Sequence, residues 1–319
     1  MPTLYHAPEL APLLSGDLPC WLVLDRLPDT LKRLYELEEA PQYVPLYART
    51  RYADCLAQSP LLVRVSDALP PLWQTFVNGH GEAPLRGVIV TSQASTAEVV
   101  AHLRSRLETR FYGQRRGLLR FYDPWIAAHL FSHAVSDSAW LGPLQRVVWH
   151  GGTFEQRAEV GAQWYALSAT DAPTSLAVPD DEMPLGLAPA QETAMERYAT
   201  RWPLWRQRVE RHGLREDSRE QARLFVTACE EAERLALPRE QWPDYLTWRF
   251  EAPEATWPEG IVDTPAERRL ARLQRHIESK KASLPADRWN EDGDTSRDKA
   301  DDAGTDVLAL LGTFAGDKE

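Results

Sequence analysis

The chain has 319 residues, of which 43% are hydrophobic and 26% are charged. This composition is typical of a globular protein with a sizeable core, and the length allows one large domain or two lobes. The net charge of −11 and the pI of about 5.3 disfavour nucleic acid as a partner, because proteins bind phosphate backbones mainly through Lys and Arg.

Cysteine usage and the N-terminal residues bear on the compartment. The three cysteines, Cys20, Cys55 and Cys229, are far apart and show no metal-ligand spacing, so we expect small buried thiols in a reducing compartment. Residues Met1 to Gly16 lack the basic start and continuous apolar core of a signal peptide. No apolar run approaches the roughly 18 residues that span a bilayer. The sequence therefore predicts a cytoplasmic protein without membrane insertion.

The first half alternates short aliphatic runs with helical patterns, which is typical of an α/β layer structure. We predict an α/β lobe over residues 1–175, with a mixed or parallel sheet flanked by helices. The expected strands are Trp21 to Asp25, Tyr43 to Tyr47, Leu61 to Val65, Val88 to Thr91, Leu118 to Tyr122 and Arg146 to Trp149. The expected helices are Asp29 to Glu38, Pro71 to Val77, Ala97 to Leu107 and Trp125 to His133. Ser95 and Glu98 have the capping-box spacing at the start of the third helix.

The second half changes to long amphipathic patterns without convincing strands. We place a boundary in the Pro-rich stretch from Ala172 to Pro189 and predict a mainly α-helical lobe over residues 189–284. Pro203 should bend the first helix of this lobe. Ser218 with Gln221, and Thr264 with Glu267, mark two further helix starts. The first helix carries apolar residues at helical spacing, namely Met195, Tyr198, Trp202, Trp205 and Val209.

Residues 285–319 form a separate segment. Between Ala286 and Asp306 there are eight acidic and three basic residues with few large apolar groups, so this part is expected to be a flexible acidic tail. It ends in a short apolar cluster that includes Leu308, Leu311 and Phe314. Three interpretations stay open for this cluster: docking on its own protein, contact with a partner, and disorder.

The search for catalytic chemistry gives one weak candidate. His129 and His133 are four residues apart on an expected helix, the spacing that places two imidazoles on one face for zinc. Leu130 stands where a metalloprotease has its general-base Glu, and no third ligand is evident. Ser132, Ser136 and Asp137 near His133 are not part of a G-x-S-x-G elbow. We therefore predict no catalytic, metal or cofactor residues, with a metal-dependent hydrolase that uses His129 and His133 as the alternative.

Twelve tryptophans are a high number for this length, and large aromatic residues dominate both cores and interface hot spots. Core packing is the expected role for most of them. Trp202 and Trp205 are candidate partner-binding residues, together with the apolar cluster at the C-terminal end of the chain.

A distinctive local sequence runs from Gly117 to Trp125 and reads Gly-Leu-Leu-Arg-Phe-Tyr-Asp-Pro-Trp. Pro124 suits the first position of a helix, and Asp123 before it can cap the free backbone N–H groups. The block Arg120, Phe121, Tyr122, Asp123 and Pro124 resembles the hallmark motif of the type VI secretion effector chaperones, also called adaptor proteins of the Tap or Tec kind. In that family the motif belongs to a domain of unknown function.

Other segments resemble the same family in the same order, from about Cys20 to Trp149. Trp125 departs from the pattern, because the family more often has Arg at that position. The matching segments are Trp21-Leu22-Val23-Leu24-Asp25, Ser59-Pro60-Leu61-Leu62-Val63, Ala101-His102-Leu103-Arg104, Trp140-Leu141-Gly142-Pro143 and Val148-Trp149.

The resemblance implies an adaptor that holds the N-terminal region of one toxin effector and loads it onto the VgrG spike, without a cofactor and without catalysis. For the five motif residues two roles stay open, which are maintenance of the fold and direct contact with a partner. A structural component of the secretion apparatus is a further alternative to the adaptor.

Overall fold

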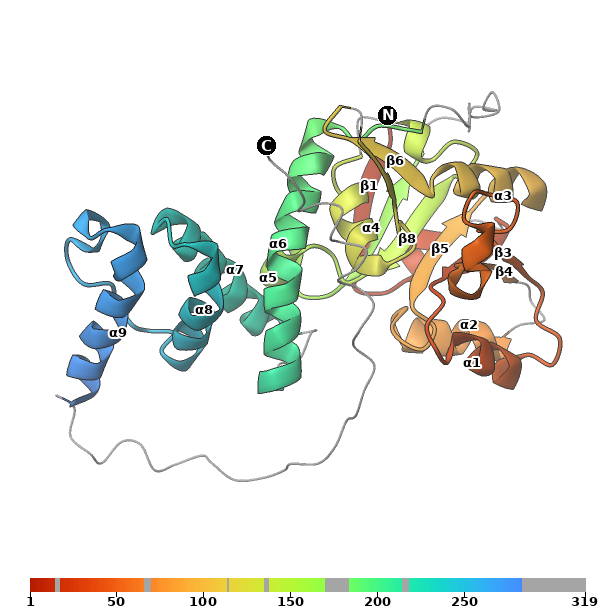
Figure 1. Cartoon of the computed structure of the whole chain (residues 1–319). Coiled ribbons are helices and arrows are strands. Elements are labelled where there is room, and N and C mark those ends of the chain that lie inside the picture. The colour runs from red at the N-terminus through yellow and green to blue at the C-terminus, as the bar shows by residue number, and fades with distance from the viewer. Residues whose placement is uncertain are drawn as a thin grey trace. The chain divides into compact units, whose positions relative to one another are not determined.

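The computed structural model describes residues 1–14, 18–65, 70–113, 115–134, 138–169, 184–213 and 218–282. The chain divides into two compact units, Met1–Arg223 and Leu224–Glu319, and Figure 1 labels many of their elements. The expected lobe boundary, in the stretch from Ala172 to Pro189, lies earlier along the chain. Helix α6, Pro189–His212, therefore belongs to the first unit, because its aromatic side chains pack there.

A seven-stranded sheet is the centre of the first unit. Every pairing between its strands is antiparallel. The prediction of a sheet flanked by helices with a mainly helical part after it is confirmed, but the expected mixed or parallel strand order is wrong. In spatial order the strands are β1 (Thr3–Ala7), β9 (Trp164–Ser168), β8 (Arg146–His150), β5 (Gly87–Thr91), β2 (Cys20–Leu24), β4 (Leu61–Val65) and β3 (Tyr43–Pro45).

The apolar strands explain this error. Strands β2 and β5 are buried along almost their whole length, and such continuous apolar runs are typical of parallel sheets covered on both faces. Here helices also cover both faces, so the central strands of an antiparallel sheet acquire the same composition.

Helices α1 (Thr30–Leu37) and α2 (Pro70–Asn78) cover one face of the sheet (Figure 1). Residues two apart on a strand share a face, and alternate residues of the central strands join the helices in one hydrophobic core. This core includes Leu22, Leu24, Leu34, Leu61, Val63, Leu72, Phe76, Ile89, Val148 and Trp164.

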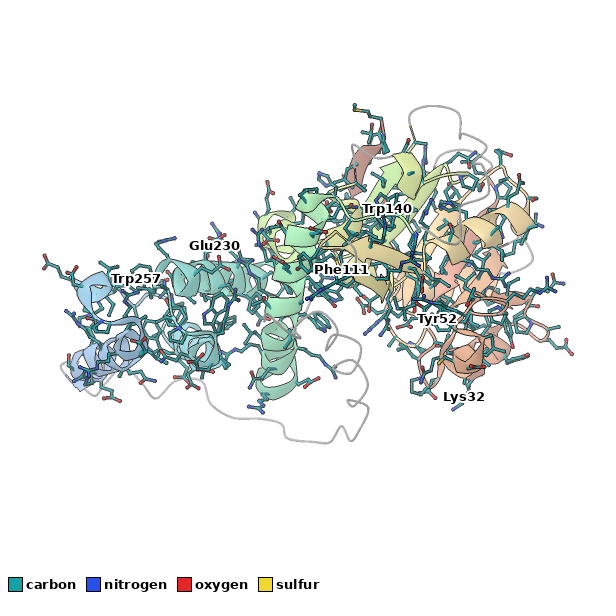
Figure 2. The ribbon with its side chains drawn as sticks, turned by 45° about the horizontal axis from the view of Figure 1, so that its top comes forward. Lys32, Tyr52, Phe111, Trp140, Glu230 and Trp257 are labelled. Carbon is teal, nitrogen blue, oxygen red and sulfur yellow. The ribbon has the colours of Figure 1, made fainter. Side chains whose placement is uncertain are left out.

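Helices α3 (Thr96–Ser105) and α4 (Pro124–Phe131) belong to the other side of the sheet. The capping box at Ser95 is confirmed, because the Ser95 hydroxyl accepts from the Glu98 backbone and the Glu98 carboxylate accepts from the Ser95 backbone. Phe131 of α4 packs on Trp149 of β8 with ring centroids 5.6 Å apart, and it also contacts Trp140, labelled in Figure 2.

A separate hairpin precedes α4. Strands β6 (Glu108–Phe111) and β7 (Arg115–Leu118) form a two-stranded antiparallel sheet, and Arg110 of β6 also makes a parallel bridge to Gly186. The predicted strand from Leu118 to Tyr122 is therefore wrong, because β7 ends at Leu118 and the motif residues form a turn. The hairpin is tied to α6, since the Tyr112 hydroxyl donates to Glu196.

Helix α5 (Phe154–Val160) and α6 complete the first unit. Helix α6 continues through Pro203 and lies along α4, as Figure 1 also shows. Short 3-10 turns lie at Ala11–Leu14, Ala53–Gln58, Ser138–Trp140, Arg239–Gln241 and Ile261–Asp263.

The second unit contains most of α7 (Arg219–Arg234) with α8 (Trp242–Glu251) and α9 (Ala266–Ala282). An ion pair joins the first two helices, because Glu231 accepts from Arg249 at 2.7 Å and from the Tyr245 hydroxyl at 2.9 Å. The Arg234 guanidinium lies over the ring of Trp257, which Figure 2 labels, at 5.6 Å. Both helix starts predicted from Ser218 and Thr264 are confirmed within one or two residues.

The core packing predicts the effect of truncating Phe76, which is 1% exposed and contacts Trp164. Phe76→Ala removes a buried ring and leaves a cavity, so the free energy of unfolding should fall by about 3–5 kcal/mol, measured by urea denaturation. Tyr5→Ala is the control, because Tyr5 is 49% exposed and its loss should change stability by about 0.5 kcal/mol or less. Equal effects of the two substitutions would contradict this packing.

Candidate functional site around the Arg-Phe-Tyr-Asp-Pro motif

The five motif residues form the turn between β7 and α4, where the chain passes the end of β2. The backbone N–H of Leu119 donates to Leu107 at 2.7 Å, and that of Asp123 donates to Arg120 at 2.9 Å. These two hydrogen bonds fix the path of the turn. Its side chains meet residues from three other parts of the first unit, in a cluster that we name the motif network: Asp25, Tyr47, Arg86, Arg120, Tyr122 and Asp123.

The shortest contact in the motif network is an ion pair. The Nη2 of Arg120 donates to Oδ2 of Asp25 at 2.6 Å, and both side chains are largely shielded from solvent, with 19% and 6% of their surfaces exposed. Asp25 follows the last residue of β2, so this pair joins the end of a central strand to the turn before α4.

A second ion pair lies beside the first. Arg86 Nη1 is 3.5 Å from Asp123 Oδ2, while Asp123 Oδ1 accepts from the Trp125 backbone N–H at 2.9 Å and so caps α4. The backbone of Asp25 donates to Arg86 at 2.7 Å. Gly87 permits this close approach, because a Cβ there would lie 2.3 Å from the Val23 carbonyl oxygen.

Two tyrosines extend the motif network toward the loop after β3. The hydroxyls of Tyr122 and Tyr47 are 3.1 Å apart, and the Arg120 guanidinium lies 5.9 Å from the centre of the Tyr122 ring. Both tyrosines are buried. The turn is thereby held to three segments that are distant in sequence.

Burial sets the direction of the pKa values in the motif network. Desolvation raises the pKa of the Asp25 carboxyl above its usual range, although the positive charge of Arg120 acts against this. The two acidic side chains keep the pKa of Arg86 and Arg120 above the usual value despite burial. Desolvation also raises the pKa of Tyr122 well above that of a free tyrosine, so the hydroxyl stays protonated at neutral pH.

The remaining motif residues pack in the core. Phe121 and Pro124 are buried, and Trp125 is 3% exposed. The Trp125 ring lies between three helices: it is 4.9 Å from Phe154 of α5 and 4.8 Å from Trp202 of α6, measured between centroids. The position at which the sequence departs from the adaptor motif is therefore an anchor for α6.

The matched family segment contains the whole motif. Residues 20–139 match a family model described as "Domain of unknown function (DUF4123)". No curated protein and no solved structure matches the chain. The DUF4123 segment begins at the first residue of β2 and ends after α4, so it includes every residue of the motif network.

The two histidines of the alternative hydrolase are placed differently by the structure. His129 is buried, with Nδ1 2.8 Å from the Trp125 carbonyl oxygen and its ring packed on Tyr198 and Phe154. His133 is exposed. Among the described residues there is no group of three or more His, Cys, Asp or Glu side chains that could hold a metal ion. Ser136 and Asp137 lie outside the described residues.

The structure describes only two of the five candidate partner-binding residues. Trp202 and Trp205 are 8% and 0% exposed and pack on Trp125, so both are core residues of the first unit. Leu308, Leu311 and Phe314 lie outside the described residues. In the described part of the chain, no helix is long and apolar enough to cross a membrane.

Sequence reasoning missed half of the motif network. Asp25 was noted only as the end of a strand, and Arg86 and Tyr47 carried no signal, since each lies more than 30 residues from the motif. The antiparallel pairing of Leu24 with Gly87 brings Asp25 and Arg86 together, and that pairing could not be predicted from one sequence.

The burial of His129 predicts a loss of stability in acid. Desolvation lowers the pKa of His129 to about 4, whereas an unfolded histidine titrates near 6.5. A depressed pKa in the folded state contributes stability above pH 6.5 that is lost as the pH falls toward 4. His129→Leu should therefore remove about 3 kcal/mol of the difference in unfolding free energy between pH 7 and pH 4, measured by urea denaturation.

The exposed His6 provides the control for this experiment. His6→Leu makes the same substitution at an exposed position. If His129→Leu retained the full acid sensitivity of the wild type, the assignment of that sensitivity to the buried imidazole would be wrong.

Proposed function

We propose that this chain is an adaptor chaperone that binds one type VI secretion toxin effector in the cytoplasm and loads it onto the VgrG spike. The N-terminal region of the toxin is the proposed cargo segment. The adaptor acts by binding alone, and we assign it no catalytic residue and no cofactor.

One observation carries this proposal. The Arg120 to Pro124 motif and three other segments that resemble the adaptor family in the same order lie within residues 20–139, the DUF4123 segment. A single five-residue motif occurs by chance far more readily than four segments in a fixed order. The order of the segments therefore supports a shared domain.

The geometry of the motif supports a scaffold role rather than chemistry. Arg120 and Asp123 are each engaged with a partner inside the first unit, and the Tyr122 hydroxyl contacts that of Tyr47. These side chains hold the end of β2 to the start of α4. On this proposal the cargo and the spike bind at other surfaces, and a stable complex would bury on the order of 1,600 Å².

The proposal predicts results for gene deletion and for copurification in the bacterium that carries this gene. Deletion of the gene should abolish secretion of the cognate toxin and lower its amount in the cell, while a second toxin of the same system should be secreted normally. The tagged chain should copurify with the toxin and with VgrG, and its association with VgrG should disappear when the toxin gene is deleted. Quantitative mass spectrometry of cellular, secreted and copurified proteins measures each of these outcomes.

Two outcomes separate the adaptor from its alternatives. Copurification with sheath or baseplate proteins in the absence of any toxin would favour a structural component of the apparatus. Unchanged toxin abundance and secretion after deletion of the gene would contradict the adaptor.

A further inference from the structure

A groove lies on the sheet of the first unit, beside the edge strand β3. Its volume is about 620 Å³, and β3, β4, the chain before β3 and the start of α3 contribute to its lining. The side chains that matter for its chemistry are Trp21, Tyr35, Gln42, Tyr43, Leu62 and Arg64. None of these residues belongs to the motif network.

The groove has one charged side chain. Arg64 is exposed, no acidic residue lines the groove, and no described residue forms a hydrogen bond or ion pair with the Arg64 side chain. A positive site without a counter-charge is notable in a chain with a net charge of −11. The guanidinium can form a bidentate pair with a carboxylate from outside.

The strand register places the side chains of the groove at a spacing of two residues. Arg64 lies directly opposite Trp21, and Leu62 lies opposite Val44. Residues two apart on a strand share a face, so the Val44–Leu62 pair and Arg64 lie on the same side. Leu62 is buried and Val44 is half-buried, so Val44 presents the apolar position and Arg64 the cationic one. An extended chain has the same two-residue repeat, so its alternate side chains match these two positions.

Aromatic groups complete the lining. Tyr35, which is 52% exposed, and Tyr43 both line the groove. The indole N–H of Trp21 has no hydrogen-bond partner in the described structure. Arg104 covers the far end of β3 by donating to the carbonyls of Pro45 and Leu46, so the accessible part of the edge is the end at Tyr43 and Val44.

We propose that this groove binds an extended peptide segment of a partner protein, in which an acidic residue pairs with Arg64 and an apolar residue two positions away packs on Val44. The proposal goes beyond the adaptor function, because it concerns the chemistry of one docking site and does not depend on secretion. Its failure would leave the proposed function standing.

A random twelve-residue peptide library displayed on phage tests the groove directly, with the purified full chain as bait. Enriched peptides are synthesised with a fluorescent label. Two variants of each peptide are also made, an amide twin in which the acidic residue is replaced by its amide and a Lys twin in which it is replaced by Lys. Fluorescence anisotropy then measures the affinity of each peptide for the wild type and for Arg64→Glu, Gln42→Glu and Arg268→Glu. Arg268 is an exposed residue of α9, so Arg268→Glu is a control with the same change of charge.

The enriched peptides should carry an acidic and an apolar residue two positions apart. Their affinity should fall about ten-fold or more for Arg64→Glu and for the amide twins, and should stay within about two-fold for Arg268→Glu. Gln42→Glu should also weaken binding, because it supplies Arg64 with a carboxylate inside the groove. The Lys twins should bind Arg64→Glu more tightly than the wild type.

Several results would overturn the proposal. Failure to enrich any peptide would do so, as would enriched peptides that bind wild type and Arg64→Glu equally. If sedimentation showed a wild-type dimer that Arg64→Glu converts to a monomer, the occupant would be a second copy of the chain. If circular dichroism shows that Arg64→Glu does not fold, the peptide affinities of Gln42→Glu and the wild type are compared instead, because Gln42 is exposed. Equal affinities would then overturn the proposal.

Discussion

The ion pair between Arg120 and Asp25 is the interaction on which the first unit depends. Two charges with little exposure to water are tolerated only when they are paired and hydrogen-bonded, and here the pair joins the end of β2 to the turn that starts α4. The position of α4 in turn fixes Trp125, on which α6 packs. A local contact between a strand end and a turn thereby determines where a 24-residue helix lies.

This arrangement explains how a sequence motif can be distinctive without forming an exposed site. The motif side chains of Arg120, Tyr122 and Asp123 pair with Asp25, Tyr47 and Arg86 inside the first unit, so the fold uses them. On the proposal made above, partners bind at surfaces whose residues are free to contact other molecules. The groove beside β3 has this property, since its single cation has no counter-charge among the described residues, whereas both arginines of the motif network are paired.

The sequence predicted the elements better than their arrangement. The capping boxes, the Asp123-Pro124 helix start and five of the six strands predicted for the first half follow from local patterns, and these have local physical causes. The predicted strand direction was wrong because a buried antiparallel strand and a buried parallel strand have the same composition.

Of the motif network, the sequence identified Arg120, Tyr122 and Asp123. Arg86 and Tyr47 are distant along the chain and reach the motif only through the strand pairing. Trp202 and Trp205 are candidate partner-binding residues by sequence and core residues in the structure, because periodicity identifies an apolar face but not what covers it.

A double-mutant cycle on Asp25→Asn and Arg120→Met tests the central ion pair most directly. The free energy of unfolding of the wild type, both single variants and the double variant is measured in urea at neutral pH. Because either single change leaves one partner buried without the other, we expect each to destabilise the fold and the double variant to recover part of the loss, with a coupling energy of about 1–3 kcal/mol. Effects that add to within about 0.3 kcal/mol would show that the two side chains do not stabilise the fold together.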